Sequence, residues 1–335
     1  MKPLDTASGR QEGFSADGPP LNRIARRQNE PEFQALQAAW KLLYRSALRT
    51  FYLQAVLTVA IPISLGVALL LLPGVTNVSV RVVEILKAVA GFYGLIIVLI
   101  DDRVLDQRQQ RLKKEAATVQ ETFDRDLFEL SWGRGKPQPL DGGKVRTLAR
   151  RWQAVDPRPD EMRDWYPAVI SNLPLYAARI VAQRSGIWWD ADLRARYVMA
   201  LQVFAAGVLL GTLVICLTLE ASLADSLVAG ATMTPVLRWA IREERRQKAV
   251  KERLEAQAND VRALWKQVVT GQISEADATI EARDLQDAIF ERRRSSPLGF
   301  SWLYRLLRGR LEEQMADDAG HCVDDFHRHR ERAHG

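Results

Sequence analysis

The chain has little of what most enzymes and secreted proteins depend on. It contains 2 cysteines in 335 residues, so no disulfide framework is available. Its 4 histidines all lie at the C-terminal end, at His321, His327, His329 and His334. A Ser-His-Asp or Cys-His arrangement would have to recruit this tail. We therefore identify no catalytic set and do not expect an enzyme.

Two short segments resemble ligand sites but lack the required spacing. The tail sequence HCVDDFHRHR holds the residue types that zinc prefers, but not the paired spacing of a structural zinc site. The segment 133–144 is rich in Gly and Pro and ends in Gly-Gly-Lys, but it does not match a phosphate-binding loop. We expect a mobile loop there, a disordered charged tail, and neither a metal nor a cofactor.

Long apolar segments are what the chain does have. They occupy 53–72, 82–100, 197–218 and 221–241, as two closely spaced pairs. A membrane-spanning helix needs about 20 mostly apolar residues. The fourth segment is the weakest, because Asp225 lies near its start and Arg238 near its end. The pattern predicts an all-α membrane protein, with four transmembrane helices in two hairpins and a helical cytoplasmic domain.

Basic residues flank the outer ends of each pair, whereas the two short turns hold only Arg81. The positive-inside rule then places both turns outside and both termini in the cytoplasm. No cleavable leader is expected at the polar N-terminus. The net charge of +6 is explained by contact with anionic lipid headgroups, so no DNA or RNA polymer is expected as a partner. The expected parts are a cytoplasmic tail and helix (1–50), hairpin 1 (51–101), a cytoplasmic domain (102–196), hairpin 2 (197–241) and a helical C-terminal region (242–335).

The soluble segments have helical patterns and no alternating, strand-like pattern. Apolar positions at helical spacing in 33–50 run directly into the first span, and 102–122 continues the second span as a solvated stalk. A helix is predicted from 242 to about 269. Ser274 and Asp277 resemble a capping box that opens a further helix, 275–293.

Few polar or small residues interrupt the spans, and each has two interpretations. Glu84, Lys87 and Asp225 are the ionisable side chains well inside them. Such residues usually face water or a partner, although a Glu84–Lys87 pair reaching the outer interface is an equal alternative. Gly207 and Gly211 form a G-x-x-x-G pattern suited to close helix contact within or between subunits.

Four blocks of residues, in order, resemble a known family. The first contains Asn22, Arg27, Gln28 and Asn29, and the second runs from Phe123 through Asp126 to Trp132. The third and densest is 164–194, and the last lies within 285–312. With the two span pairs, these blocks resemble the SMODS-associated four-transmembrane effectors, a family of pore-forming proteins of bacterial cyclic-oligonucleotide anti-phage signalling.

This resemblance implies an effector in the bacterial inner membrane. A partner synthase would make a cyclic oligonucleotide, and the effector would then oligomerise and permeabilise the membrane. Such a messenger presents phosphates and base faces, which guanidinium groups and aromatic rings recognise. The residues predicted to bind it are Arg150, Arg151, Trp165, Tyr166, Arg179, Gln183, Arg184, Trp189 and Asp190. For any one of them, a core or membrane-interface aromatic or a solvated cation is the slightly favoured interpretation.

Two other functions remain open from the sequence. A small-solute channel or transporter would also span the membrane, although the span pairs show no internal repeat. A membrane-anchored scaffold would bind protein partners through helices within 242–318.

Overall fold

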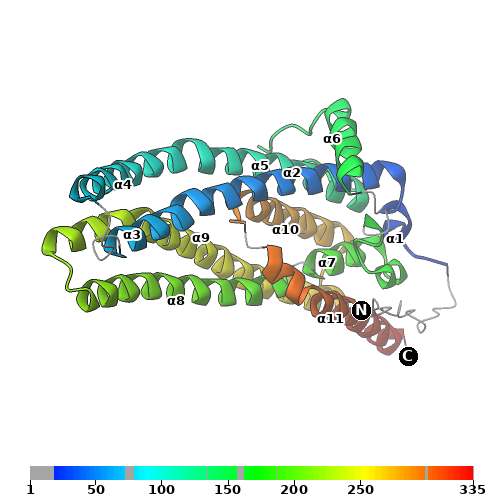
Figure 1. The fold of residues 1–335 in the computed structure, drawn as a ribbon. Coiled ribbons are helices and arrows are strands. Elements are labelled where there is room, and N and C mark those ends of the chain that lie inside the picture. Colours follow the sequence, from blue (N-terminus) through cyan, green and yellow to red (C-terminus); the bar gives the residue numbers. More distant parts are fainter. Residues whose placement is uncertain are drawn as a thin grey trace, which may run out of the picture.

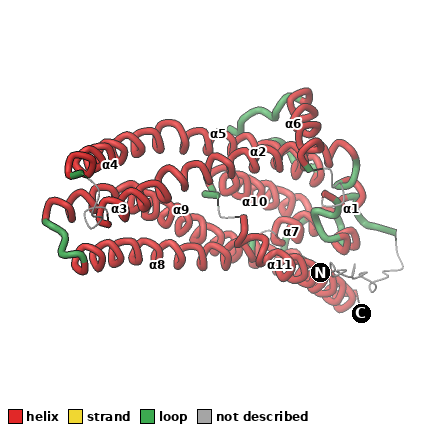
Figure 2. The backbone as a smooth tube through the Cα atoms, viewed as in Figure 1, coloured by secondary structure: helices red, strands yellow, loops and turns green. Residues whose placement is uncertain are grey.

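The computed structural model describes residues 19–71, 79–133, 135–156, 162–185, 187–298 and 301–334; at 188–193, 301–314 and 333–334 it describes the backbone alone. Throughout these residues every regular element is a helix and none is a strand (Figure 2). This confirms the predicted all-α class.

Long helices dominate the molecule. Helix α2 (Pro31–Ala55) continues through a π-helical turn, Val56–Ala60, into α3 (Ile61–Leu71). Helix α4 (Val80–Ile100) continues through a second π-helical turn, Asp101–Leu105, into α5 (Asp106–Phe128). Helices α8 (Trp188–Thr218) and α9 (Leu223–Val269) form an antiparallel pair (Figure 1). Within the described residues, three helices are long and apolar enough to cross a membrane: Pro31–Leu71, Val80–Phe128 and Arg194–Thr218.

The predicted fourth span, 221–241, is not among these three, but it forms the first half of α9. This half contacts α3, α4 and α8. Its residues Ala229, Thr232, Met233 and Val236 are buried among them. We call α3, α4, α8 and the 223–241 part of α9 the span bundle. A helix enclosed by others has fewer positions that face lipid, so its weaker apolar character fits its central place.

The other ends of these helices pack with shorter helices into a second part. These are α1 (Ile24–Arg27), α6 (Gly142–Val155), a 3₁₀ turn (Ala168–Asn172), α7 (Leu175–Ser185), α10 (Glu275–Ser295) and α11 (Ser301–His334). Together with α2, α5 and the 242–269 part of α9 they form what we call the head domain (Figure 1). The boundaries predicted at 101/102 and 241/242 lie inside continuous helices, so these helices belong to both parts.

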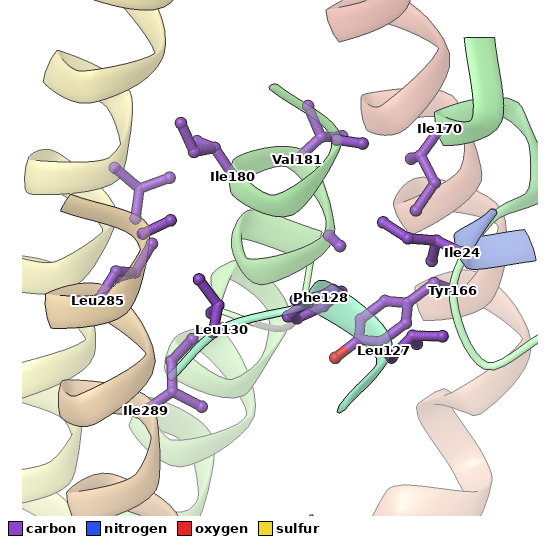
Figure 3. Packing of buried hydrophobic residues seen from close by; sticks show 14 of the residues in the cluster. Ile24, Leu127, Phe128, Leu130, Tyr166, Ile170, Ile180, Val181, Leu285 and Ile289 are labelled. Atoms are coloured by element: carbon purple, nitrogen blue, oxygen red, sulfur yellow. The ribbon is translucent and has the colours of Figure 1, made fainter. Parts of the chain in front are cut away.

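A single large core holds the head domain together. Phe123 of α5 meets Phe33 and Trp40 of α2 edge to face, with ring centroids 5.4 and 5.0 Å apart. Figure 3 shows Ile24, Phe128 and Tyr166 packed close to one another in this core. Helix α5 is therefore not the solvated stalk that its charged sequence predicted, because one of its faces is fully buried.

Local sequence signals set several helix ends. The Ser274 hydroxyl accepts a hydrogen bond from the Asp277 amide at 3.1 Å, and the helix begins at Glu275 as predicted. Helix α8 begins at Trp188, so Asp190 lies within its first turn. Helix α9 ends at Val269, two residues before Gly271, whose φ of 69° suits glycine.

The C-terminal tail is not the disordered segment that its charge predicted. Residues 315–332 belong to α11, and Ala319, Cys322, Val323 and Phe326 are buried in the head-domain core. The Phe326 ring lies between Tyr176 and Trp265, with centroids 6.5 and 6.4 Å away. Apolar residues three and four positions apart supply this buried face.

Candidate functional site

Two buried carboxylates on α5 form the centre of the head domain's polar contacts. Glu121 accepts hydrogen bonds from Lys136 at 2.5 Å, Arg283 at 2.6 Å and Gln286 at 3.0 Å. Asp124 accepts from the Tyr166 hydroxyl at 2.7 Å, from Gln286 at 2.9 Å and from Arg293. Buried carboxylates need such partners, because an unpaired charge in the interior is costly. The cluster joins α5, α10 and the loops carrying Lys136 and Tyr166.

Burial and neighbouring charges determine the protonation of two members of this cluster, Tyr166 and Arg293. Burial, reinforced by the neighbouring Asp124 carboxylate, raises the pKa of Tyr166 well above its ordinary value. Burial alone would lower the pKa of Arg293, but Asp124 and Tyr166 outweigh it and the pKa is raised. Tyr166 is therefore a neutral phenol that donates to Asp124, and Arg293 is a permanent cation.

Arg179 and the amide nitrogen of Gln183, both on α7, donate to protein groups, whereas the buried Gln183 Oε1 has no hydrogen-bond partner among the described residues. The Arg179 guanidinium donates to the Phe128 and Glu129 carbonyls at 2.6 and 3.3 Å, and to the Thr279 hydroxyl at 2.9 Å. Burial lowers the pKa of Arg179 from its ordinary value. The Gln183 amide donates to the Ala282 carbonyl at 2.9 Å and to Gln286 at 3.0 Å. In this structure both residues connect α7 to its neighbours.

The first family block connects the N-terminal turn to the 164–173 segment. Asn22 donates to the carbonyls of Ile170 and Leu173, at 2.7 and 2.9 Å. Gln28 exchanges two hydrogen bonds with the backbone of Tyr166. Asn29 donates to the Asp164 carboxylate and accepts from the Asp164 backbone amide. Side-chain amides hold this segment in place because they can donate and accept at once. Their role here is structural.

The remaining residues of the family blocks support the same corner. Arg27 pairs with Glu129 at 3.3 Å and lies over the Phe33 ring. Arg125 binds Asp126 and lies over the Trp132 ring, 5.1 Å from its centroid. Phe123 is in the core described above.

Three predicted ligand residues lie on the surface of the head domain. Arg150 and Arg151 are exposed on α6, whose buried residues Val145 and Ala149 face the rest of the domain. Trp165 is 36% exposed and meets Trp40 edge to face, with centroids 5.4 Å apart. Arg45 of α2 lies over the Trp152 ring of α6, 5.9 Å from its centroid. This surface offers cations and aromatic rings close to one another.

The last predicted ligand residues lie where α7 gives way to α8. Arg184 pairs with Asp318 of α11 at 2.6 Å. Trp189 and Asp190 belong to the first turn of α8, but their side chains lie outside the described residues. The nine predicted residues thus divide into an exposed group, a buried structural group and this junction. Ligand binding by any of them stays a prediction.

In the span bundle, the three predicted polar residues come together. Lys87 of α4 lies 3.0 Å from Glu84 on its own helix and 2.6 Å from Asp225 of α9. Asp225 also accepts a hydrogen bond from the Ser222 hydroxyl at 2.7 Å. Asp225 is therefore paired with a residue of another helix.

The glycines of the G-x-x-x-G pattern make no close helix contact within the subunit. A Cβ atom on Gly207 or Gly211 would meet nothing within 4 Å. Both line an apolar cavity of about 150 Å³ between α3, α8 and α9. The close approaches occur elsewhere: a Cβ on Gly66 would lie 2.2 Å from Met233 Cε, and one on Gly94 would lie 3.6 Å from the Ala231 carbonyl oxygen. Contact between subunits through Gly207 and Gly211 stays a prediction.

Sequence analysis missed the carboxylate cluster. Glu121, Asp124 and Gln286 each resemble ordinary surface residues of a charged helix. Lys136 lies in the segment predicted to be mobile, yet its ammonium group also pairs with Asp287 at 2.6 Å. The one available signal was helical spacing, because Arg283, Gln286 and Arg293 lie on related turns of α10. Among the described residues, no group of three or more His, Cys, Asp or Glu is placed to hold a metal ion.

Comparison with known families decides the family. A family model described as the SMODS-associating 4TM effector domain matches residues 22–321. The chain belongs to this family. The match confirms the resemblance of the four sequence blocks, and with the three long apolar helices it fits a membrane effector in defence. The family is described as an effector domain and not by a catalytic activity. No curated protein and no solved structure matches the chain.

Proposed function

We propose that this SMODS-associating effector senses a cyclic oligonucleotide made by a partner synthase, oligomerises and permeabilises the bacterial inner membrane. One observation carries the proposal: three of the four helices of the span bundle, α3, α4 and α9, continue without a linker into the head domain. A ligand that repacks the head domain must therefore also move the spans. Neither a passive anchor nor a simple scaffold needs this continuity.

In this proposal 221–241 is the fourth span, and both short turns lie outside the cell. Support comes from α9 itself, which contacts all three apolar helices of the bundle. Its polar residues are accommodated by these contacts, since Thr232 is buried and Asp225 is paired with Lys87. Polar groups inside a membrane are normally satisfied in this way.

The messenger would bind the exposed cationic and aromatic surface of the head domain. Arg150 and Arg151 offer guanidinium groups to its phosphates, and Trp165 offers a ring face to a base. Tyr166, Arg179 and Gln183 would act from beneath by holding this surface in place. Arg184 would respond at the α7–α11 contact through its pairing with Asp318.

Oligomerisation is proposed because a bundle this small encloses little space. Helix α8 is the natural contact surface, since only 6% of its most apolar stretch is buried within the subunit. Large side chains such as Leu210, Leu213 and Leu217 point outward along it. A homo-oligomer would bury them against a second copy.

The test is inducible expression in bacteria with and without the partner synthase. Loss of membrane potential, followed with a voltage-sensitive dye, is expected only when both proteins are present and the synthase is active. The control is a synthase variant without its catalytic carboxylates. Constitutive, solute-specific flux would instead indicate a transporter, and an unchanged membrane potential with the active synthase would contradict permeabilisation.

A further inference from the structure

A ladder of ion pairs joins α4–α5 to α9 where the span bundle meets the head domain. Arg242 contacts Asp101 at 2.6 Å and Asp102 at 2.8 Å. Arg246 binds Asp106 through two hydrogen bonds of 2.6 and 2.9 Å. Arg238 binds Asp102. The three arginines are four residues apart, so they lie along one face of α9.

The π-helical turn explains how the acidic side matches this spacing. Its hydrogen bond runs from the Asp106 amide to the Asp101 carbonyl, five residues back. In an ordinary α-helix residues five apart point in different directions, but a π turn brings them toward the same face. Asp101 and Asp106 can therefore both face α9.

The ladder is most strongly desolvated at Asp101. This side chain is 4% exposed, against 40% for Asp102. Gln54 of α2 donates to Asp101 and accepts from Gln109 of α5 at 2.5 Å, so α2 joins the same contact. Burial would raise the pKa of Asp106, but its hydrogen bond and ion pair with Arg246 outweigh burial and lower it. Asp106 is thus charged at neutral pH.

A short segment of the head domain contacts residues next to the ladder. Lys113, one helical turn beyond Gln109, donates to the Ser296 carbonyl at 2.9 Å. Gln247, one residue after Arg246, donates to the Leu298 carbonyl at 3.3 Å. Ser296 directly follows α10, the helix whose Gln286 and Arg293 bind Asp124. A shift of α10 would therefore disturb both the carboxylate cluster and the ladder.

We propose that the ladder of ion pairs between Asp101, Asp102 and Asp106 and Arg238, Arg242 and Arg246 is a latch. It keeps the C-terminal end of α4 next to the middle of α9 until α10 moves. This inference rests on the proposed permeabilisation and names its control point. The charge-assisted hydrogen bonds within these pairs suit a latch because they depend on close distance and alignment. The π turn that presents them is a local irregularity of the kind found at functional sites. Losing one pair shifts the balance between joined and separated helices.

The test uses Arg246→Asp, which reverses the charge facing Asp106, in cells without the synthase. Messenger-independent depolarisation is expected. The fraction of molecules with separated helices should rise roughly tenfold or more over the wild type. The double variant Asp106→Arg/Arg246→Asp restores the pair in reverse and should return the cells to the wild-type level. Arg245→Gln is the matched control, because this exposed neighbour on α9 lies outside the ladder. Membrane-fraction amounts are compared so that lost protein is not taken for lost function.

A second readout separates the latch from the proposed function. Spin labels at the exposed positions Arg108 and Arg245 report the α5–α9 distance in purified protein without any pore assay. Arg246→Asp should lengthen or broaden this distance, and the double variant should restore it. If Arg246→Asp changes neither the α5–α9 distance nor the membrane potential, the latch proposal is wrong. The distance could change in Arg246→Asp while neither this variant nor the wild type with active synthase depolarises the cells. That result would support the latch and contradict permeabilisation.

Discussion

The Lys87 ammonium nitrogen lies 2.6 Å from a carboxylate oxygen of Asp225. The two residues belong to α4 and α9, so the pair joins the two predicted hairpins near their short turns. Both side chains are largely covered, at 20% and 25% exposure. Ser222 holds the other carboxylate oxygen of Asp225, which orients the pair. The Lys87 ammonium therefore serves two carboxylates, Glu84 on its own helix and Asp225 on α9.

Removing one member of this pair should destabilise the span bundle. Asp225→Asn leaves the Lys87 ammonium with Glu84 as its only carboxylate partner, at a cost on the order of 1–3 kcal/mol. Thermal unfolding in detergent should show a lower melting temperature. The triple variant Glu84→Gln/Lys87→Met/Asp225→Leu should recover most of the loss, because it leaves no member of this cluster charged and unpaired. An unaltered melting temperature for Asp225→Asn would mean that the pair contributes nothing.

Substituting Arg179 and Arg150 in turn should distinguish an arginine that stabilises the fold from one that binds the messenger. Arg179→Ala removes a buried cation and leaves the Phe128 carbonyl without its donor, so a loss of about 2–4 kcal/mol is expected without any messenger. Arg150→Ala on exposed α6 should leave the melting temperature unchanged and weaken messenger binding in calorimetry. The reverse pattern would assign the ligand contact to α7.

Lys113 predicts a pH dependence of stability. Burial lowers its pKa from 10.5 to about 8. Between these values the unfolded chain binds more protons than the folded one, so this group makes stability rise with pH, by at most about 1.4 kcal/mol per unit. Melting temperatures from about pH 7.5 to 9.5 should therefore rise more in the wild type than in Lys113→Met. Exposed Lys114→Met is the control and should follow the wild type.

Cys322 should report the packing of α11. Burial raises the pKa of its thiol to about 11, and the side chain is 3% exposed. In a Cys216→Ser background, alkylation near neutral pH should be more than about a hundredfold slower than in denaturant. Phe326→Ala, which loosens α11 against Tyr176 and Trp265, should accelerate it. Fast alkylation of the intact protein would show that α11 does not stay packed.

Membrane orientation can be tested with single cysteines in a background lacking Cys216 and Cys322. Glu220→Cys, in the exposed turn between α8 and α9, should react with an impermeant maleimide on intact spheroplasts. Lys144→Cys, at the exposed start of α6, should react only after lysis. Labelling of position 144 from outside would reverse the proposed orientation.

Sequence patterns predicted what depends on neighbours along the chain. Lipid demands long apolar runs, so three spans were evident, and the capping box at Ser274 was correct because it involves only one turn. The segment predicted as the fourth span has a weaker apolar pattern, and its helix packs against α3, α4 and α8. That arrangement is tertiary and leaves no local signature. Helix α5 was misjudged for the same reason, because Glu121 and Asp124 are buried with partners more than 150 residues away.

The sequence predicted the types of residue that a ligand site needs, but not which of these residues are accessible to a ligand. Arg150, Arg151 and Trp165 lie on an accessible surface, as a ligand site requires. Tyr166, Arg179 and Gln183 have the same chemistry but are occupied by protein groups. Periodicity cannot distinguish these cases, because a guanidinium binds a backbone carbonyl as readily as a phosphate.

The unbroken course of α9 has a mechanical consequence. At about 1.5 Å per residue, its 47 residues form a rod about 70 Å long. A stiff rod held near its middle swings its two tips in opposite directions when it tilts. A small sideways displacement at Val269 would thus be accompanied by an opposite displacement at Leu223, the other end of the helix.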